Sequence, residues 1–464
     1  MRPGRIMKLS FNEGKRSEGG LSPGRLSAYV GLCLGAAVLV VAALTLLLGD
    51  HILNAYGKGK IERAFDRAYP GRALRIGELD YSIGANRLTA RSVELNTTNS
   101  TLRAGRISLT GVRWARLLFG KPTPAHLLAK AGLDASDIEI NFTRANYGFR
   151  CARLRASVPG SELIAEGADL SPLTGDKEIF SASAFRTTRF HVIIPECRVS
   201  SLDFGELIEG KSYRAGAVTV SRPLFDALVD RDKPVGPLLK RPLMAGEALA
   251  AIRKPLRIDS LNINDGRVRY AERVIDGADP GVITISTVNI SVEGLTNRGK
   301  EPAAILLRAQ GSLMDAGLIK LLMTIPVHST DLSFHYSGSL GAMDLTRLDA
   351  FLDIAEHLRI KSGSVQELTF DIDVASGRSR GRVLAVYRDL KVAVRDKRSG
   401  SENGLGDQLA SFLMNTFKIQ NTKVRNASGA MGEGRVNYTR KPGDEFMQFV
   451  WFSLRSGILS VISL

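Results

Sequence analysis

Residues 368–374 read Leu-Thr-Phe-Asp-Ile-Asp-Val, and this short stretch decides the fold class. Its apolar side chains stand at every second position, with polar side chains between them. Successive side chains of a β-strand point to opposite faces, so the pattern predicts a strand with one buried face and one wet face. Asp371 and Asp373 fall on the wet face, where we expect them to keep the sheet soluble.

The same period of two recurs outward from this stretch along most of the chain. Strands are predicted at Leu74–Ile83, Leu88–Leu95, Leu102–Leu109, Asp137–Thr143, Tyr147–Val158, Leu256–Ile263, Val268–Ala271 and Thr287–Val292. Turns are predicted at Gly84-Ala-Asn86 and Asn264-Asp-Gly266, and a one-residue slip at Arg388-Asp389 predicts a β-bulge. The result is a mostly β protein with short helices. A curled gutter and a closed sandwich would hide the apolar faces equally well.

An uncharged apolar run at residues 26–48, LSAYVGLCLGAAVLVVAALTLLL, has the length of a membrane-spanning helix. It is too long for the apolar part of a signal peptide, and the LLLGD that ends it offers no cleavage site. The preceding tail, 1–25, carries six basic and two acidic residues. The positive-inside rule therefore predicts a single-pass protein with a cytoplasmic N-terminus. In a bacterium the body would be periplasmic and the anchor would lie in the inner membrane.

The pattern changes divide the chain into six predicted parts. They are a cytoplasmic basic tail at 1–25, a transmembrane helix at 26–48, a juxtamembrane helix at 50–72, two β-rich parts at 73–254 and 255–440, and an apolar C-terminal helix at 444–464. The juxtamembrane helix would rise from the lipid surface and bring basic side chains to anionic headgroups, each contact contributing about 1 kcal/mol. These candidate headgroup contacts are Lys58, Lys60, Arg63 and Arg67.

The C-terminal helix carries a narrow polar stripe on an otherwise apolar surface. The stripe consists of Ser453, Ser456, Ser460 and Ser463. A second membrane span would place Arg455 near the middle of the bilayer, at a cost of roughly 2.5–3.5 kcal/mol. We therefore expect a helix that caps the end of a groove or lies in a membrane interface, with a second span as the alternative.

Charge and cysteines set limits on the partners. The 464 residues carry a net charge of +16. An exported body meets no nucleic acid, so anionic lipid headgroups are the expected partner, and solubility is the simpler alternative. Cys33 lies in the predicted anchor, whereas Cys151 and Cys197 are exported. A disulfide between them and two buried, unpaired thiols are equally compatible with the sequence.

No catalytic or metal-binding arrangement is predicted. Gly205–Ser212 fits the phosphate-loop pattern by letter, but two glutamates would face the phosphates, and Tyr213–Val220 alternates like a strand where a helix is needed. We therefore predict no nucleotide binding. None of the 6 histidines stands at metal-ligand spacing from another. His335 lies on the polar face of a strand, as a solvated residue. We expect no enzyme activity, no cofactor and no metal.

Several phrases of the second half resemble the AsmA-like group of bacterial envelope proteins, of the AsmA, TamB and YhdP type, and among them the members of unassigned function. These phrases are Leu261–Tyr270, Ile285–Leu295, Gly338-Ser-Leu340, Ile360–Val365 and Gly381–Tyr387. The resemblance covers Leu256–Leu464 and, more weakly, Asp50–Thr110. It implies a long antiparallel sheet curled into an open, taco-like groove, along which larger relatives carry phospholipid acyl chains between the two membranes. None of these phrases is catalytic, so the resemblance implies no active-site residue.

The resulting hypothesis is an inner-membrane-anchored periplasmic protein whose apolar β-groove binds or conducts phospholipid for envelope homeostasis. The candidate groove residues are Leu332, Phe334, Tyr336, Leu368, Phe370, Ile372, Val374, Val383 and Tyr387. Because alternation marks any half-buried strand, these residues could equally form an ordinary packed core. The alternative function is a non-enzymatic scaffold or assembly factor that binds other envelope proteins through its sheet edges. A hydrolase is disfavoured because no nucleophile–base arrangement is present.

Overall fold

The computed structural model describes residues 58–82, 84–113, 124–234, 236, 242–275, 277–298, 304–327, 332–355, 358–394, 421–425 and 431–463. The predicted basic tail and anchor, 1–48, lie outside the described residues. Within the described ranges, no helix is long and apolar enough to cross a membrane.

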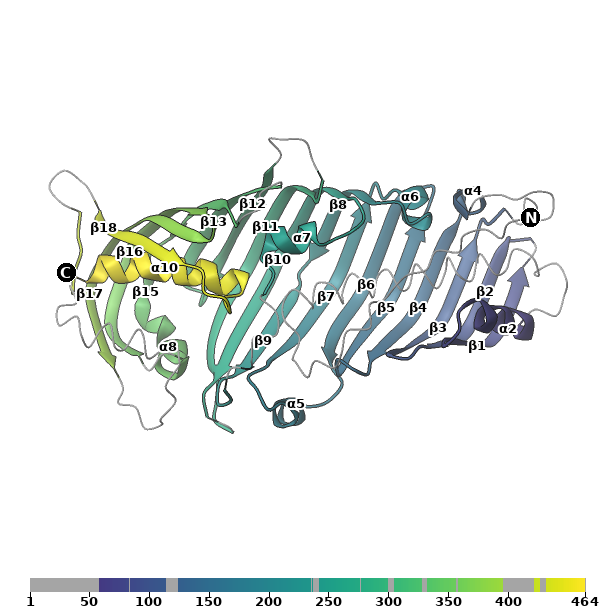
Figure 1. The fold of residues 1–464 in the computed structure, drawn as a ribbon, viewed down its shortest axis with the longest axis horizontal. Coiled ribbons are helices and arrows are strands. Elements are labelled where there is room, and N and C mark those ends of the chain that lie inside the picture. The colour runs from purple at the N-terminus through teal and green to yellow at the C-terminus, as the bar shows by residue number, and fades with distance from the viewer. Residues whose placement is uncertain are drawn as a thin grey trace.

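The strands form one 18-stranded sheet that runs the length of the molecule (Figure 1). Its first half contains β1 (Ala73–Ser82), β2 (Arg87–Asn96), β3 (Ser100–Thr110), β4 (Gly132–Phe142), β5 (Tyr147–Ser157), β6 (Glu162–Pro172), β7 (Thr188–Ser200), β8 (Tyr213–Ser221) and β9 (Leu224–Asp230). Its second half contains β10 (Leu256–Arg273), β11 (Gly281–Thr296), β12 (Ala304–Leu313), β13 (Gly317–Pro326), β14 (Phe334–Leu340), β15 (Met343–Asp344), β16 (Leu358–Ala375), β17 (Arg378–Val394) and β18 (Gly432–Thr439). The mostly β fold is therefore confirmed.

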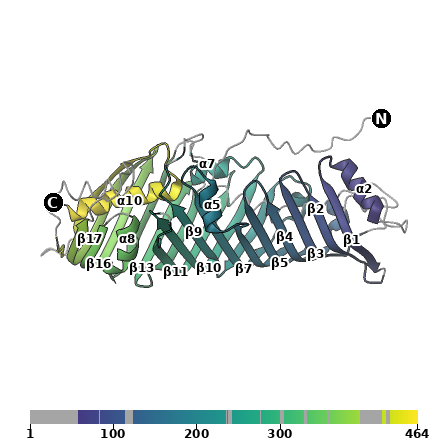
Figure 2. The same ribbon diagram turned by 90° about the horizontal axis from the view of Figure 1, so that it is seen from below.

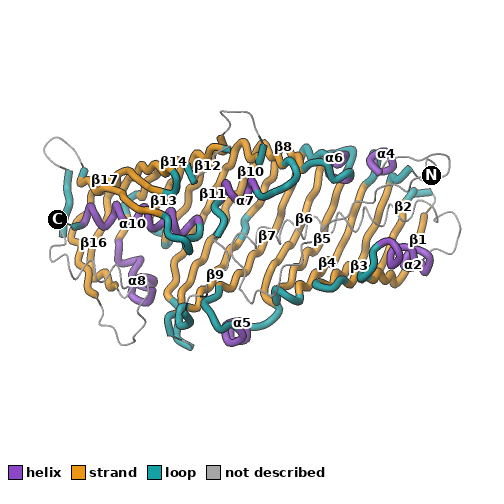
Figure 3. Tube along the Cα trace, in the orientation of Figure 1, coloured by secondary structure: helices purple, strands orange, loops and turns teal. Residues whose placement is uncertain are grey.

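Helices flank this sheet; most are short, and the longest, α10, lies across its last strands (Figure 3). They are α2 (Lys58–Ala68), α4 (Pro124–Leu128), α5 (Asp176–Ala182), α6 (Phe204–Ile208), α7 (Ala245–Ala250), the 3₁₀ turn η1 (Leu345–Leu348), α8 (Asp349–Ala355) and α10 (Phe446–Ile462). The described part of the predicted juxtamembrane helix forms α2, and the predicted C-terminal helix forms α10.

The sheet is mixed, which corrects the expectation of a purely antiparallel one. Strands β8 and β9 lie end to end beside β7, and both pair in parallel with β10. After β9 the chain returns past α7 before β10 begins, so Leu256 enters the sheet opposite Tyr213, at the same end as β8. The other pairings are antiparallel between neighbours.

A line of irregular positions, which we call the crease, crosses the first seven strands. It consists of Gly77, Ser92, Gly105, Asp137, Ala152, Gly167 and Pro195, each skipped in the pairing of its strand with the next. The backbone is left-handed on every second strand, with φ of 51°, 56° and 62° at Ser92, Asp137 and Gly167. Irregularities of this kind bend a strand and shift its alternation by one residue. The seven aligned positions divide the sheet along one line into two parts, here called its two walls.

The crease also explains a prediction that was wrong. Asn264-Asp-Gly266 is not a turn between two strands, because β10 runs unbroken from Leu256 to Arg273. Asp265 has a φ of 53°, and the register shifts around Gly266. These residues lie beside the break between β8 and β9, so the crease continues through β10. The bulge predicted at Arg388-Asp389 is confirmed, since Asp389 has a φ of 54° at a register shift.

Candidate lipid-binding face

The face of the sheet that carries the apolar side chains, here called the inner face, is apolar on both sides of the crease. On β5, Phe149 and Cys151 precede the crease and Leu154 follows it, and all three are buried. The shifted alternation keeps all three on one face, although a regular strand would turn Leu154 outward. Inner-face residues of β1 to β7 form a single buried cluster with side chains from α2, α4 and α6.

The opposite, outer face is covered by cross-strand ion pairs in this half of the molecule. Examples are Arg91 with Glu78 at 2.9 Å, Arg153 with Asp134 at 2.7 Å and Arg150 with Glu139 at 3.5 Å. Each of these side chains is at least one-third exposed, so each pair adds little stability. Their effect is to keep the outer face wet while the inner face stays dry.

Cys151 and Cys197 lie on the inner face next to the crease as free, buried thiols. They stand on β5 and β7, with Ala168 of β6 opposite Cys151 and Ala165 of β6 opposite Cys197. A whole strand therefore separates them, and the structure favours the unpaired alternative. Burial is the main cause that raises the pKa of the Cys197 thiol to about 11.

The nine candidate groove residues lie on the inner face at the other end of the sheet, under α10. Phe334, Tyr336, Phe370, Ile372, Val374 and Val383 belong to one cluster with Phe449 and Val450 of that helix; Leu332 and Leu368 pack against it; and Tyr387 belongs to a second cluster with Val461. The Tyr336 hydroxyl donates to the Val450 carbonyl at 3.2 Å. Here the sheet and α10 form a packed core, and Figure 1 shows the helix lying across these strands.

Two glycines let α10 approach the sheet closely. A Cβ atom on Gly457 would lie 2.4 Å from a methyl carbon of Val383 and 2.6 Å from one of Val436, and a Cβ atom on Gly434 would lie 2.3 Å from the Gly457 carbonyl oxygen. Next to this contact the hydroxyls of Ser379 and Ser453 form a fully buried hydrogen bond of 2.6 Å. The helix is therefore held at a fixed depth against β17 and β18.

The serine stripe of α10 faces the last strand of the sheet. Ser460 accepts a hydrogen bond from the Arg435 backbone N–H at 3.0 Å, and Ser456 accepts one from the Asn437 N–H at 3.2 Å. Strand β18 pairs only with β17 among the described strands, so these N–H groups belong to an open edge. The stripe predicted from sequence therefore caps a sheet edge.

The open edge of the first strand, β1, is capped in the same way by α2, with carboxylates in place of serine hydroxyls as the acceptors. Glu62 and Asp66 of α2 accept hydrogen bonds from the backbone N–H groups of Ile76 at 2.7 Å and Leu74 at 3.3 Å. At each end, two helix residues four apart thus bind two edge residues two apart. Figure 2 shows α2 and α10 at opposite ends of the molecule.

The candidate headgroup contacts lie on α2. Arg63 and Arg67 are exposed, and their side chains donate to the Gly59 and Arg63 carbonyls of their own helix. The side chains of Lys58 and Lys60 lie outside the described residues.

Two motifs weighed for chemistry stand in structures that do not resemble active sites. The phosphate-loop match spans α6 and is followed by strand β8, while the Ser212 hydroxyl donates to Glu206. His335, Asp371 and Asp373 come close enough on the outer face to share an ion, a proximity that sequence spacing did not predict. His335 Nδ1 is 2.9 Å from Asp373, the Asp373 side chain is 78% exposed, and arginines of β17 stand opposite both aspartates. The three are best described as polar residues of the outer face.

No protein-family model matches the sequence, and no curated protein is significantly similar to it. The functional assignment therefore depends on the two faces of the sheet and on its capped edges.

Proposed function

We propose that this protein is an AsmA-like, inner-membrane-anchored periplasmic protein that holds phospholipid acyl chains on the inner face of β1 to β7, between the two walls of the crease. The observation that carries the proposal is the aligned crease. It keeps apolar side chains on one face of both walls for seven consecutive strands, and so makes a continuous apolar strip across the sheet.

The two halves of the inner face then have different roles. Among the described residues, no helix lies across the middle of β3 to β6, whereas α10 covers β14 to β18 (Figures 1 and 3). The candidate groove residues under α10 form the closed end, and acyl chains bind nearer β1. The inner side chains are buried, so bound lipid tails must replace contacts that this face already makes.

The capped edges disfavour the scaffold alternative. Strand addition uses the free N–H groups of an edge strand. At Leu74, Ile76, Arg435 and Asn437 those groups already have acceptors in α2 and α10. A protein partner would have to displace a helix before it could pair with either edge.

The proposal is tested by placing charge on the inner face of the full-length protein. Leu79 and Leu95 are half-buried on opposite walls, so the double variant Leu79→Glu, Leu95→Glu puts carboxylates beside the acyl chains without filling the centre of the core. Burying an ionised carboxylate against lipid tails is strongly unfavourable. The control is Thr101→Glu, which adds one carboxylate, half the charge of the double variant, to the outer face of β3.

The measurement is phospholipid bound per protein after purification in one detergent, with thermal unfolding followed in parallel. All variants keep residues 26–48, so lipid around the predicted anchor is common to them. We expect the wild type and Thr101→Glu to retain equal amounts of phospholipid per protein. The double variant should lose most of its phospholipid, apart from the lipid around the predicted anchor that all variants share. Equal lipid in all three folded proteins would refute the proposal.

A further inference from the structure

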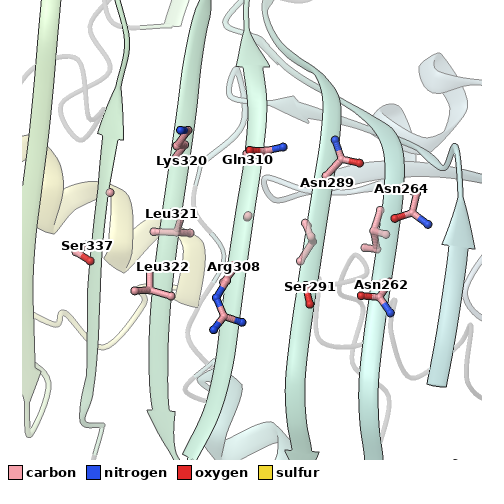
Figure 4. Close-up of a pocket in the computed structure, with 14 residues that line it drawn as sticks. Asn262, Asn264, Asn289, Ser291, Arg308, Gln310, Lys320, Leu321, Leu322 and Ser337 are labelled. Atoms are coloured by element: carbon pink, nitrogen blue, oxygen red, sulfur yellow. The ribbon is translucent and has the colours of Figure 1, made fainter. Parts of the chain in front are cut away.

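A hollow of about 510 Å³ lies on the outer face across β10 to β14, away from the proposed acyl-chain site (Figure 4). Its lining falls into three neighbouring rows of the sheet. The middle row, Ile263, Ile290, Ala309, Leu321 and Gly338, is joined strand by strand in the pairing register. Leu321 of this row packs on the inner-face cluster. The middle row therefore contributes backbone to the floor of the hollow.

The two flanking rows form the sides. One side is Asn262, Ser291, Arg308, Leu322 and Ser337, and the other is Asn264, Asn289, Gln310 and Lys320. The result is a trough across five strands. Strand spacing gives it a length of about 19 Å and a width of about 7 Å.

The trough differs in composition from the rest of the outer face. On β2 to β7, equivalent positions carry long arginine and glutamate side chains that pair across the strands and cover the backbone. Here most are shorter amides and hydroxyls, which leave the backbone open. Arg308 is paired with Glu293, which stands outside the lining. In the described ranges, Gln310 and Lys320 make no side-chain hydrogen bond or ion pair.

The lining chemistry selects the ligand. It provides amide and hydroxyl groups, which both donate and accept, and two cations, with no carboxylate and no aromatic ring among the 14 residues. Single-stranded nucleic acid would need aromatic rings to stack on. A chain rich in hydroxyls that also carries carboxylates matches the amide, hydroxyl and cationic groups of the lining. We infer that the trough binds a linear acidic saccharide, with Lys320 and Arg308 facing its anionic groups and the amides facing its hydroxyls.

The test uses full-length protein in detergent and titrates it with tetragalacturonate, maltotetraose as a neutral chain of equal length, and inorganic phosphate as a competitor. Lys320→Gln removes one cation and Gln310→Glu adds a repelling charge. Lys361→Gln and Gln366→Glu make the same changes at exposed positions on β16, outside the trough. Lipid content is measured in parallel, because this site lies on the other face and does not depend on lipid binding.

We expect tetragalacturonate to bind more tightly than maltotetraose. Lys320→Gln should weaken the acidic ligand about two- to fivefold, as for an exposed ion pair, and leave the neutral ligand unchanged. Gln310→Glu should weaken the acidic ligand at least as much, and both β16 controls should match the wild type. Equal affinity for the two saccharides, full competition by phosphate, or equal loss in trough and control variants would each overturn the inference.

Discussion

Because α10 packs closely on the sheet, we predict that a glycine-to-alanine substitution has opposite effects on protein stability in two helices. Gly457 and Gly246 both lie inside helices, and changing either to alanine should favour its helix by up to about 1 kcal/mol. A Cβ atom on Gly246 of α7 meets nothing within 4 Å, so Gly246→Ala should stabilise the protein by up to that amount. On Gly457, the same atom would lie 2.4 Å and 2.6 Å from methyl carbons of two buried valines.

The size of the second effect follows from these distances. Carbon atoms in contact prefer about 3.5–4.0 Å, so α10 must move outward by roughly 1 Å. Valine side chains are stiff at χ1, and Val383 is fully buried, so the sheet offers no easy relaxation. Overpacking of a core costs about 1–3 kcal/mol. After subtracting a helix gain of about 1 kcal/mol, Gly457→Ala should destabilise the protein by up to about 2 kcal/mol.

The assay is unfolding of the full-length protein in urea, followed by tryptophan fluorescence, since Trp451 is one of 2 tryptophans and lies on α10. The midpoint should fall for Gly457→Ala and rise or stay constant for Gly246→Ala. The buried Ser379–Ser453 hydrogen bond should also weaken, seen as faster exchange of nearby backbone amides. Equal stabilisation by both substitutions would refute the close packing of α10.

Three further results are expected. Replacing Ser456 and Ser460 with alanine should speed exchange of the two β18 edge amides and cost about 1 kcal/mol per lost hydrogen bond; unchanged exchange would contradict the edge cap. Iodoacetamide at pH 8 should barely modify Cys197, because a pKa raised to about 11 leaves about a thousandth of the thiol as thiolate. Labelling as fast as that of a solvent-exposed cysteine would contradict its burial. Glu272→Gln removes the carboxylate that lies 2.6 Å from the buried Arg231 guanidinium, so it should destabilise the protein by about 3–5 kcal/mol. The double variant Arg231→Met, Glu272→Leu removes both charges and should recover most of that stability in thermal unfolding.

Much of the fold could be predicted because alternation is a local signal. Each side chain of a half-buried strand faces either the core or water, so the alternation can be recognised from the residues of that strand alone. Strands such as β1, β2 and β5 were therefore expected close to their observed bounds. The parallel pairing of β10 was missed because it depends on where the 25-residue connection 231–255 ends relative to β8 and β9. No residue pattern in that connection indicates this position.

The crease was missed for a related reason. One slip in alternation reads as a bulge or a turn, and Asn264-Asp-Gly266 was interpreted as a turn. Only the register shows that the slips of separate strands fall on one line. The serine stripe of α10 was visible in sequence, but its acceptor role was not, because its partners are backbone N–H groups without a side-chain signature.

The sequence predicted which apolar side chains share one face of the sheet, but not that a helix covers them. Apolar inner-face residues such as Tyr336 and Ile372 were identified correctly as one face of the sheet, which the register confirms by pairing them directly. Their cover was not predicted, because α10 lies about 75–115 residues further along the chain. The outer-face trough was missed because its amides and cations come from four separate strands.

The most direct test of the proposed function places a photoreactive group on each face of one strand. Phe149 and Arg150 are neighbours on β5; the first is buried on the inner face and the second forms an ion pair with Glu139 on the outer face. A benzoylphenylalanine at either position is irradiated in the full-length protein within membranes, and the adduct is identified by mass spectrometry. Lipid binding between the walls of the crease predicts phospholipid adducts at position 149 and none at 150. Phospholipid at both positions, or only intramolecular crosslinks at 149, would contradict it.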